Sequence, residues 1–174
     1  MSANQLTDEE IMAQVAEGNL DVLRVLFDKH HVHVYNFLYK MSGDKMLSED
    51  LTQDVFYKVI KYRASYNNGS FISWLFTIAR NSLNSHFTRN KEAHSNLETV
   101  KYRLGEEEKE EDYSHLHKAL KQLDASDREL VVLHRFQGIK YQELAEIMES
   151  TPGAVKTKMS RALKKLKNIY LQTI

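Results

Sequence analysis

The sequence predicts an all-α protein of two small helical domains joined by a flexible acidic linker, the C-terminal domain being a helix-turn-helix. Apolar residues recur three or four positions apart along most of the chain, and period-two alternation is nearly absent. This helical pattern fades between about residues 91 and 112 into charged and polar residues. With 174 residues the chain is long enough for two small domains. We place them at residues 1–92 and 113–174, with the linker at 93–112.

The first domain is predicted to hold four helices. Thr7 to Glu10 forms a capping box that opens a short helix, and Gly18 can end it. A long helix follows from Asp21 to about Met41. The last two helices are expected to begin at Ser48, as N-cap, and at Ser70.

The second domain is predicted to hold short helices followed by a longer basic one. Residues 126–129, Ser-Asp-Arg-Glu, read as another capping box, and Gly138 as a helix stop. A short helix spans Tyr141 to Glu149. Thr151 then caps the last helix, with Pro152, the single proline of the chain, in its first turn.

Composition narrows the function classes. The chain has no cysteine, which excludes disulfides and thiolate metal sites. The N-terminus lacks a signal-peptide pattern, and no apolar run reaches the length of a membrane span, so we expect a cytoplasmic protein without membrane insertion. His30, His31 and His33 have no companion ligands that would complete a metal site. No catalytic constellation or phosphate loop is present, so we expect neither an enzyme nor a cofactor.

The net charge of zero hides a segregation of sign along the chain. From Thr151 to the end there are six Lys or Arg and no acid, whereas residues 106–112 carry six acids and one base. A neutral whole therefore does not argue against a nucleic-acid partner, because the charge of a patch matters more than the sum.

The basic helix has one apolar and one basic side. Val155, Met159 and Leu166 share a face, and the cations lie on the others. With the short helix before it, this helix forms a pair that fits the major groove of DNA. The side chains near its start are expected at base edges, and later lysines at phosphates. The candidates are Lys156, Thr157, Ser160 and Arg161 for bases and Lys164 and Lys165 for phosphates. A solvated basic helix remains the alternative at this point.

Two motifs resemble one known family. The tail GIKYQELAEIMESTPGAVKTKMSRALKKLK is similar to the promoter-reading end of bacterial sigma factors. SEDLTQDVFYKVIKY, followed by SFISWLFTIARNSLNSHFTRNK, resembles the other signature of that family, in the same order and at the same spacing. Because the chain has no room for further domains, it resembles the extracytoplasmic-function (ECF) group of the sigma-70 family.

The resemblance implies a role for the acidic face of the third helix. Polar and acidic side chains point away from its apolar stripe, and these are Glu49, Asp50, Gln53 and Asp54. An acidic face suits a basic partner helix, which the family implies is the β′ clamp of core RNA polymerase. The family also implies contact between the second domain and the β flap, and most of its members are held inactive by an anti-sigma factor.

The fourth helix mixes amides, cations and aromatic residues, as single-stranded DNA sites do. The resemblance implies that it takes the downstream (−10) promoter element, while the basic tail takes the upstream (−35) element. Its candidate contacts are Arg80, Asn81, Asn84, Arg89, Lys91 and Trp74, although the spacing of Trp74 also suits the core. The polar loop at residues 65–70 is expected to complete a base pocket.

Two other functions remain open from the sequence. A sigma-like decoy would bind an anti-sigma protein without touching DNA, but it would be expected to lose basic contacts, and Arg80, Lys156 and Arg161 are present. A free-standing regulator would use only the helix-turn-helix, which leaves the signature at residues 48–91 without a role. We therefore expect a sigma factor that directs core polymerase to promoters and assists promoter opening.

Overall fold

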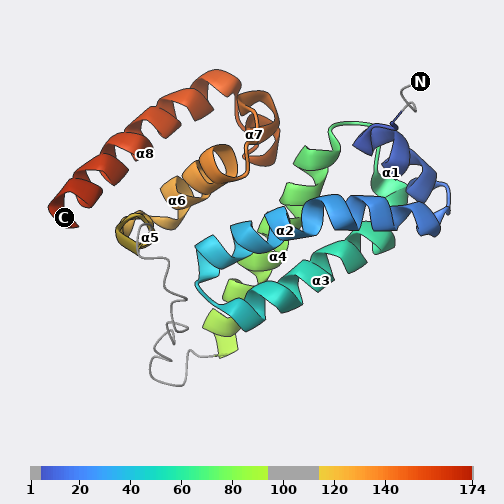
Figure 1. The fold of residues 1–174 in the computed structure, drawn as a ribbon, viewed down its shortest axis with the longest axis horizontal. Coiled ribbons are helices and arrows are strands. Elements are labelled where there is room, and N and C mark those ends of the chain that lie inside the picture. The colour runs from blue at the N-terminus through green and yellow to red at the C-terminus, as the bar shows by residue number, and fades with distance from the viewer. Residues whose placement is uncertain (1–4, 94–113, 174) are drawn as a thin grey trace.

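A computed structural model describes residues 5–93 and 114–173 of the chain (Figure 1). Every regular element within these ranges is helical, which confirms the predicted all-α fold. The predicted linker lies outside the described residues except for its first position, and the acidic run at residues 106–112 lies wholly outside them. None of the helices in the described part is both long and apolar enough to cross a membrane.

The first domain is a bundle in which α2, α3 and α4 pack together and α1 packs against α2 and α4. Large side chains from all three main helices fill its core, among them Phe37, Val55 and Phe76. Its elements are α1 (Asp8–Ala16), η1 (Leu20–Val22), α2 (Leu23–Ser42), α3 (Lys45–Lys61), η2 (Arg63–Ser65) and α4 (Phe71–Ala93).

Two of the predicted helix starts in this domain are confirmed. Thr7 Oγ1 accepts from the Glu10 backbone N–H at 3.2 Å, and Glu10 Oε2 accepts from the Thr7 N–H at 2.8 Å, which is the expected capping box. Ser70 caps α4 by accepting from the Ser73 N–H at 3.2 Å.

The predicted start of α3 was wrong by one turn. Gly43, with φ of 67°, ends α2 in the left-handed conformation, so the chain is already turned when it reaches Asp44. Asp44 then caps α3 by accepting from the Leu47 N–H at 3.0 Å. Ser48 lies inside the helix, fully buried, with its Oγ 3.2 Å from that of Ser42.

The second domain packs α5, α6 and α7 against the long α8. Leu130, Leu144 and Met159 are buried between these helices. Its elements are α5 (Ser114–Gln122), α6 (Ala125–Val131), the π-helical turn η3 (Val132–Phe136), α7 (Tyr141–Ile147) and α8 (Pro152–Thr173). Gly138, with φ of 69°, lies beyond η3, where a helix stop was expected.

The expected capping box at Ser126 was also wrong. Asp124 caps α6 by accepting from the Asp127 N–H at 2.8 Å. The two residues of the expected box have other partners: Ser126 Oγ accepts a hydrogen bond from Lys158, and Glu129 binds Arg80 of the first domain. Tertiary contacts therefore override the local pattern here.

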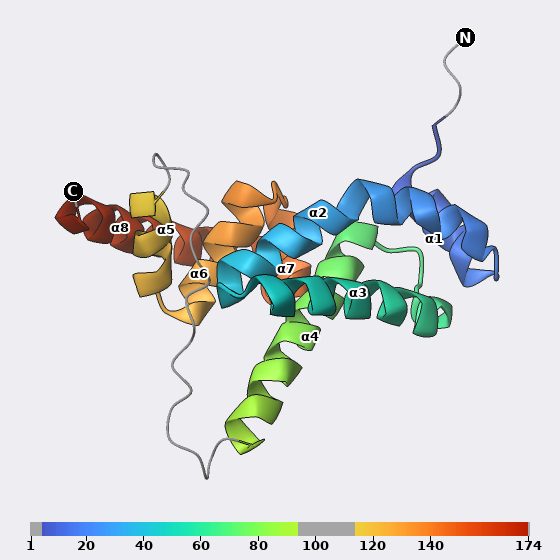
Figure 2. The same cartoon turned by 60° about the horizontal axis from the view of Figure 1, so that its bottom comes forward.

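The two domains touch each other. The N-terminal half of α4 lies against α7, and α2 lies against η3 and α6. The C-terminal half of α4 projects away from this junction (Figure 2).

Candidate nucleic-acid and protein interfaces

The basic helix α8 is the second helix of a helix-turn-helix. The chain turns between α7 and α8 at Glu149, whose φ of 52° is in the left-handed region. Thr151 Oγ1 accepts from the Ala154 N–H at 3.2 Å and so begins α8 where the sequence predicted. The apolar side of α8 is buried through Val155, Met159, Ala162 and Leu166. The basic side is left outward.

All four predicted base-reading side chains are exposed in the first half of α8, and these are Lys156, Thr157, Ser160 and Arg161. Lys156 Nζ lies 5.5 Å from the centre of the Tyr141 ring, so a cation–π contact orients it beside the turn. Thr157 Oγ1 donates to the Gly153 carbonyl at 3.1 Å and keeps its oxygen as an acceptor. The face combines donors and acceptors that suit base edges in the major groove.

The two predicted phosphate contacts differ in their surroundings. Lys164 and Lys165 are both exposed, but Lys165 Nζ lies 3.0 Å from Asp127 Oδ2. The hydrogen bond and charge of Asp127 raise the pKa of Lys165. Since Asp127 is buried and already neutralises that ammonium, Lys165 is less available to a phosphate than Lys164.

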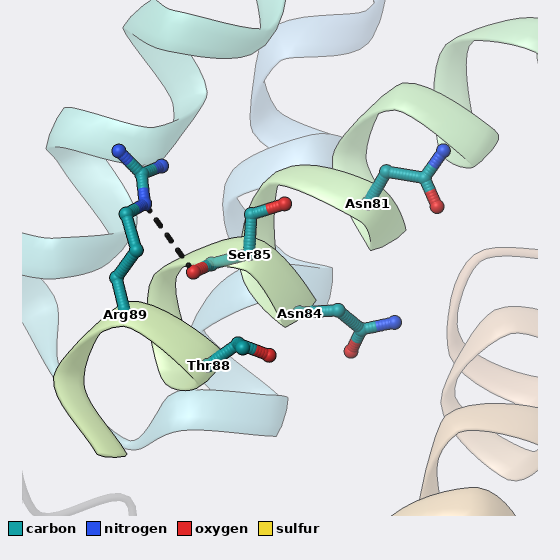
Figure 3. Close-up of a pocket in the computed structure, with 5 residues that line it drawn as sticks. All are labelled: Asn81, Asn84, Ser85, Thr88 and Arg89. Atoms are coloured by element: carbon teal, nitrogen blue, oxygen red, sulfur yellow. Dashed lines mark hydrogen bonds between the residues drawn. The ribbon is translucent and has the colours of Figure 1, made fainter. Parts of the chain in front are cut away.

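The exposed half of α4 carries an open concavity of about 480 Å³ (Figure 3). Its lining is polar and contains two predicted amides and one predicted cation; the full set is Asn81, Asn84, Ser85, Thr88 and Arg89. Asn81 and Asn84 point to one side of α4, and the Arg89 guanidinium points to the other, with its Nε donating to the Ser85 carbonyl at 3.4 Å. The amides and hydroxyls suit the edge of an unstacked nucleotide, and a cation on the same helix suits the phosphate backbone of the strand.

Two lining residues were missed by sequence reasoning. Ser85 and Thr88 lie one turn beyond Asn81 and Asn84 on the same exposed surface, and a helical wheel of α4 would have found them. The loop at residues 65–70 does not line the concavity. Its Tyr66 is buried and donates from its hydroxyl to the Gly69 carbonyl at 2.6 Å, and burial together with Glu9 and Asp8 raises the pKa of Tyr66 to about 12.

The remaining candidates of α4 lie apart from the concavity. Trp74 packs against the core, with its ring 5.4 Å from that of Tyr66 and 6.3 Å from that of Phe71. Arg80 Nε donates to Glu129 Oε1 of the second domain at 2.5 Å. Lys91 is exposed in the last turns of α4.

The outward face of α3 is acidic, as predicted. Glu49, Asp50 and Gln53 are exposed. Asp54 is half-exposed, and its Oδ2 lies 2.9 Å from Lys58 Nζ, which also donates to Ser82 Oγ of α4. Asp54 is therefore partly occupied within the first domain.

Large apolar side chains flank this acidic face, and the sequence analysis did not predict them as contacts. Met46 is 75% exposed and Tyr57 is 61% exposed. Met46 lies four residues before Asp50, and Tyr57 lies four residues after Gln53. This helical spacing puts all four side chains on the same side of α3. Exposed apolar groups beside charged ones are typical of protein interfaces. Extending the helical wheel to both ends of α3 would have revealed them.

The histidines of α2 serve the fold. Asp8 Oδ2 lies 2.8 Å from His30 Nε2, and Asp8 Oδ1 lies 2.9 Å from Lys29 Nζ. Burial lowers the pKa of His30 despite this carboxylate. Burial alone would raise the pKa of Asp8, but Lys29 and His30 outweigh it and lower it. No cluster of His, Cys, Asp or Glu suited to a metal ion occurs among the described residues.

Comparison with known proteins assigns both halves of the chain. Residues 26–93 match the family described as Sigma-70 region 2, and residues 114–166 match Sigma-70, region 4. The RNA polymerase sigma factor CarQ of Myxococcus xanthus is 32% identical over 164 residues, which cover 91% of this chain and 94% of CarQ. The chain belongs to the ECF group of the sigma-70 family. It is therefore an RNA polymerase sigma factor that directs transcription initiation to promoters.

Further relatives agree with this placement. The ECF RNA polymerase sigma factor SigX of Bacillus subtilis is 27% identical over 160 residues, covering 84% of this sigma factor and 82% of SigX. RpoE of Bartonella quintana, solved in complex with the anti-sigma factor NepR, superposes with a TM-score of 0.76 at 25% identity, over 86% of this chain and 96% of RpoE. CnrH, solved with the cytosolic domain of CnrY, has a TM-score of 0.74 at 22% identity, over 93% of this chain and 96% of CnrH, and so shares the fold.

Proposed function

We propose that this sigma factor divides promoter recognition among three surfaces. The acidic face of α3 docks on the β′ clamp of core polymerase, α4 takes the downstream element as separated strands, and α8 reads the upstream element as duplex. The observation that carries the proposal is the placement of the α3 and α4 surfaces. The exposed face of α3 is opposite the stripe that packs on α2 and α4, so polymerase and a DNA strand can be bound at once.

The chain then acts by binding and orienting, in the cytoplasm, with no catalytic step of its own. The exposed cations of α8 argue against a decoy that never touches DNA, since α8 presents Lys156, Arg161 and Lys164 to solvent. The complex of RpoE with the anti-sigma factor NepR supports an anti-sigma partner for this chain too.

Transcription from a promoter library tests the proposal as a whole. Core polymerase with the protein should select a set of promoters that share an upstream and a downstream element, whereas core alone should select none. Asp50→Arg should lower the affinity for core without changing helicity, because Asp50 is exposed and the substitution reverses its charge. Lys45→Ala, an exposed change at the first residue of α3, serves as a control. Unchanged core affinity for Asp50→Arg would remove α3 from the interface.

Strand separation gives a second test, aimed at α4. Asn81→Ala should impair promoter opening, read by permanganate reactivity of unpaired thymines, more than it impairs closed-complex binding. The exposed Lys61 of α3 provides a matched control as Lys61→Ala. Equal permanganate patterns for Asn81→Ala and the parent protein would refute the role of α4.

A further inference from the structure

Two acidic side chains of the second domain reach into the first. Glu129 of α6 accepts from Arg80 Nε at 2.5 Å, and the two side chains are only 12% and 30% exposed. Glu143 of α7 accepts from Ser70 Oγ at 3.3 Å through its Oε1, and from Ser73 Oγ at 3.4 Å through its backbone carbonyl. The second domain thus covers the start and the middle of α4.

The groups held in this way are ones that a DNA strand would use. Arg80 is a candidate contact for the downstream element, and Ser70 ends the polar loop that precedes α4. A carboxylate bound to a guanidinium makes the same kind of charge-assisted hydrogen bond as a phosphate oxygen does. One guanidinium cannot give the same Nε–H to both partners at full strength.

We propose that the docked second domain is an internal competitor of the promoter strand, with Glu129 and Glu143 in the places of DNA acceptors. This inference rests on the proposed function of α4. Strand capture through Arg80 then requires the two domains to separate. The concavity around Asn81 and Asn84, the acidic face of α3 and the basic face of α8 are all exposed in the docked arrangement. The competition is therefore confined to the step that uses Arg80.

The rest of the junction contains further polar contacts beside a small apolar part. Arg128 Nη1 donates to the Met41 carbonyl at 3.2 Å, and Lys40 Nζ lies 5.0 Å from the centre of the Phe136 ring. A cavity of about 170 Å³, whose lining includes Ile72, Phe76 and Ile139, remains between the domains. Polar interfaces between domains of one chain are typical of domains that move relative to each other.

Distance measurements between spin labels test the docked arrangement. The chain has no cysteine, so Val25→Cys on α2 and Leu171→Cys on α8, at side chains that are 52% and 53% exposed, give one labelled pair in the full chain. We expect one narrow distance distribution, the docked distance, for the parent protein and a broader distribution for Arg80→Glu or Glu129→Arg. The double variant, which restores an ion pair, should recover the docked distance. Equal distributions in all four proteins would overturn the proposal.

Binding of single-stranded DNA tests the competition. The probe is a fluorescein-labelled strand of about 12 nucleotides with randomised sequence. Glu129→Ala should bind it about fivefold more tightly, because Arg80 becomes available. Glu146→Ala, which removes an exposed acid of α7, is the matched control and should stay within about twofold of the parent protein.

Two results of this titration would contradict the competition. One is an equal gain for Glu129→Ala and Glu146→Ala, which would be a general charge effect. The other is a gain for Glu129→Ala that persists when Arg80→Ala is added. A failure of the proposed function would appear in a separate experiment, the transcription assay with core polymerase. Neither the label distances nor the strand titration depends on that assay. If the protein failed to support transcription while its label distances responded to the charge swap, the docked arrangement would stand and the proposed function would be refuted.

Discussion

Arg161 is the side chain of α8 that we expect to carry most of the sequence preference. It is exposed in the first half of the helix, the half from which a helix inserted in the major groove contacts base edges. Arg161→Ala should lower the affinity for the preferred upstream element by about 1–3 kcal/mol and the affinity for scrambled duplex much less. A fluorescence titration on both duplexes measures this difference. Equal losses on the two would make α8 an electrostatic anchor without readout.

Lys164 and Lys165 should contribute differently to DNA binding, because their neighbouring side chains differ. Lys164→Ala should weaken binding to every duplex and reduce the salt slope by about one unit, since one phosphate contact is lost. Lys165→Ala should change the slope less, because Asp127 lies 3.0 Å from the ammonium and already neutralises it. Titrations at several salt concentrations compare the two variants directly. A larger change of slope for Lys165→Ala would mean that this ion pair opens when DNA binds.

At the scale of helices, the sequence predicted most elements but not their exact starts. Helical spacing and the Thr7 and Thr151 caps are local, so they could be read correctly. The starts of α3 and α6 were missed because an aspartate immediately before each helix caps it, while Ser48 is buried inside α3. A capping box predicts a helix start only when its acid is not bound elsewhere.

The candidate contacts show the same limit. Residue type predicted Asn81, Asn84 and Arg89 as contacts, and all three line one open concavity, with Arg89 turned to the other side of α4 from the two amides. Type alone could not reveal that Arg80 is bound to Glu129, because the two residues are far apart in sequence. From the sequence we recognised the acidic residues of α3 but overlooked the apolar residues that flank them, because we chose candidates by charge and polarity.

The α3 face should bind polymerase through its apolar ends as well as its acids. Met46→Ala and Tyr57→Ala should each lower the affinity for core enzyme by about 1–2 kcal/mol, as truncation of exposed anchors in a protein interface does. Stability should change by no more than about 0.5 kcal/mol, since both side chains are exposed. Binding to labelled core polymerase and thermal unfolding measure the two effects. Val25→Ala, an exposed apolar change on α2, is the matched control.

If Val25→Ala lowers core affinity as much as Met46→Ala does, the effect is not specific to α3. If neither Met46→Ala nor Tyr57→Ala lowers it, the interface is limited to the acidic residues between them. In both cases the contact expected of Asp50 is tested separately by its charge reversal.

The whole molecule combines the two proposed DNA-binding surfaces, and the junction affects them differently. The outward side of α8 is exposed while Arg80 is bound to Glu129, so under our proposal the docked chain presents its duplex-binding surface before its strand-binding surface. This order matches the sequence of promoter binding, in which duplex is engaged before it is opened. The junction thus provides a physical reason why the protein would not capture single strands before promoter duplex is bound.

Acidity should favour the docked arrangement. Burial raises the pKa of Glu129, and this effect outweighs the lowering by the charges of Arg80 of α4 and Lys158 of α8. The docked form therefore binds a proton on Glu129 more readily than the separated form does. This contribution to docking is fully present below the ordinary pKa of a glutamate and is lost as the pH rises through the raised pKa.

The spin-label pair on Val25→Cys and Leu171→Cys measures this pH dependence. The fraction of the docked distance should rise as the pH falls from about 8 to about 5. Glu129→Gln keeps an acceptor oxygen for Arg80 but cannot titrate. It therefore distinguishes the effect of Glu129 from that of His33, whose Nδ1 lies 3.2 Å from Gln137 Oε1 in the same junction. The response of the parent protein should therefore exceed that of Glu129→Gln at the acid end. An equal response of the two proteins would mean that a group other than Glu129 causes the pH dependence. A docked-distance fraction that falls in acid would reverse the sign argued for Glu129.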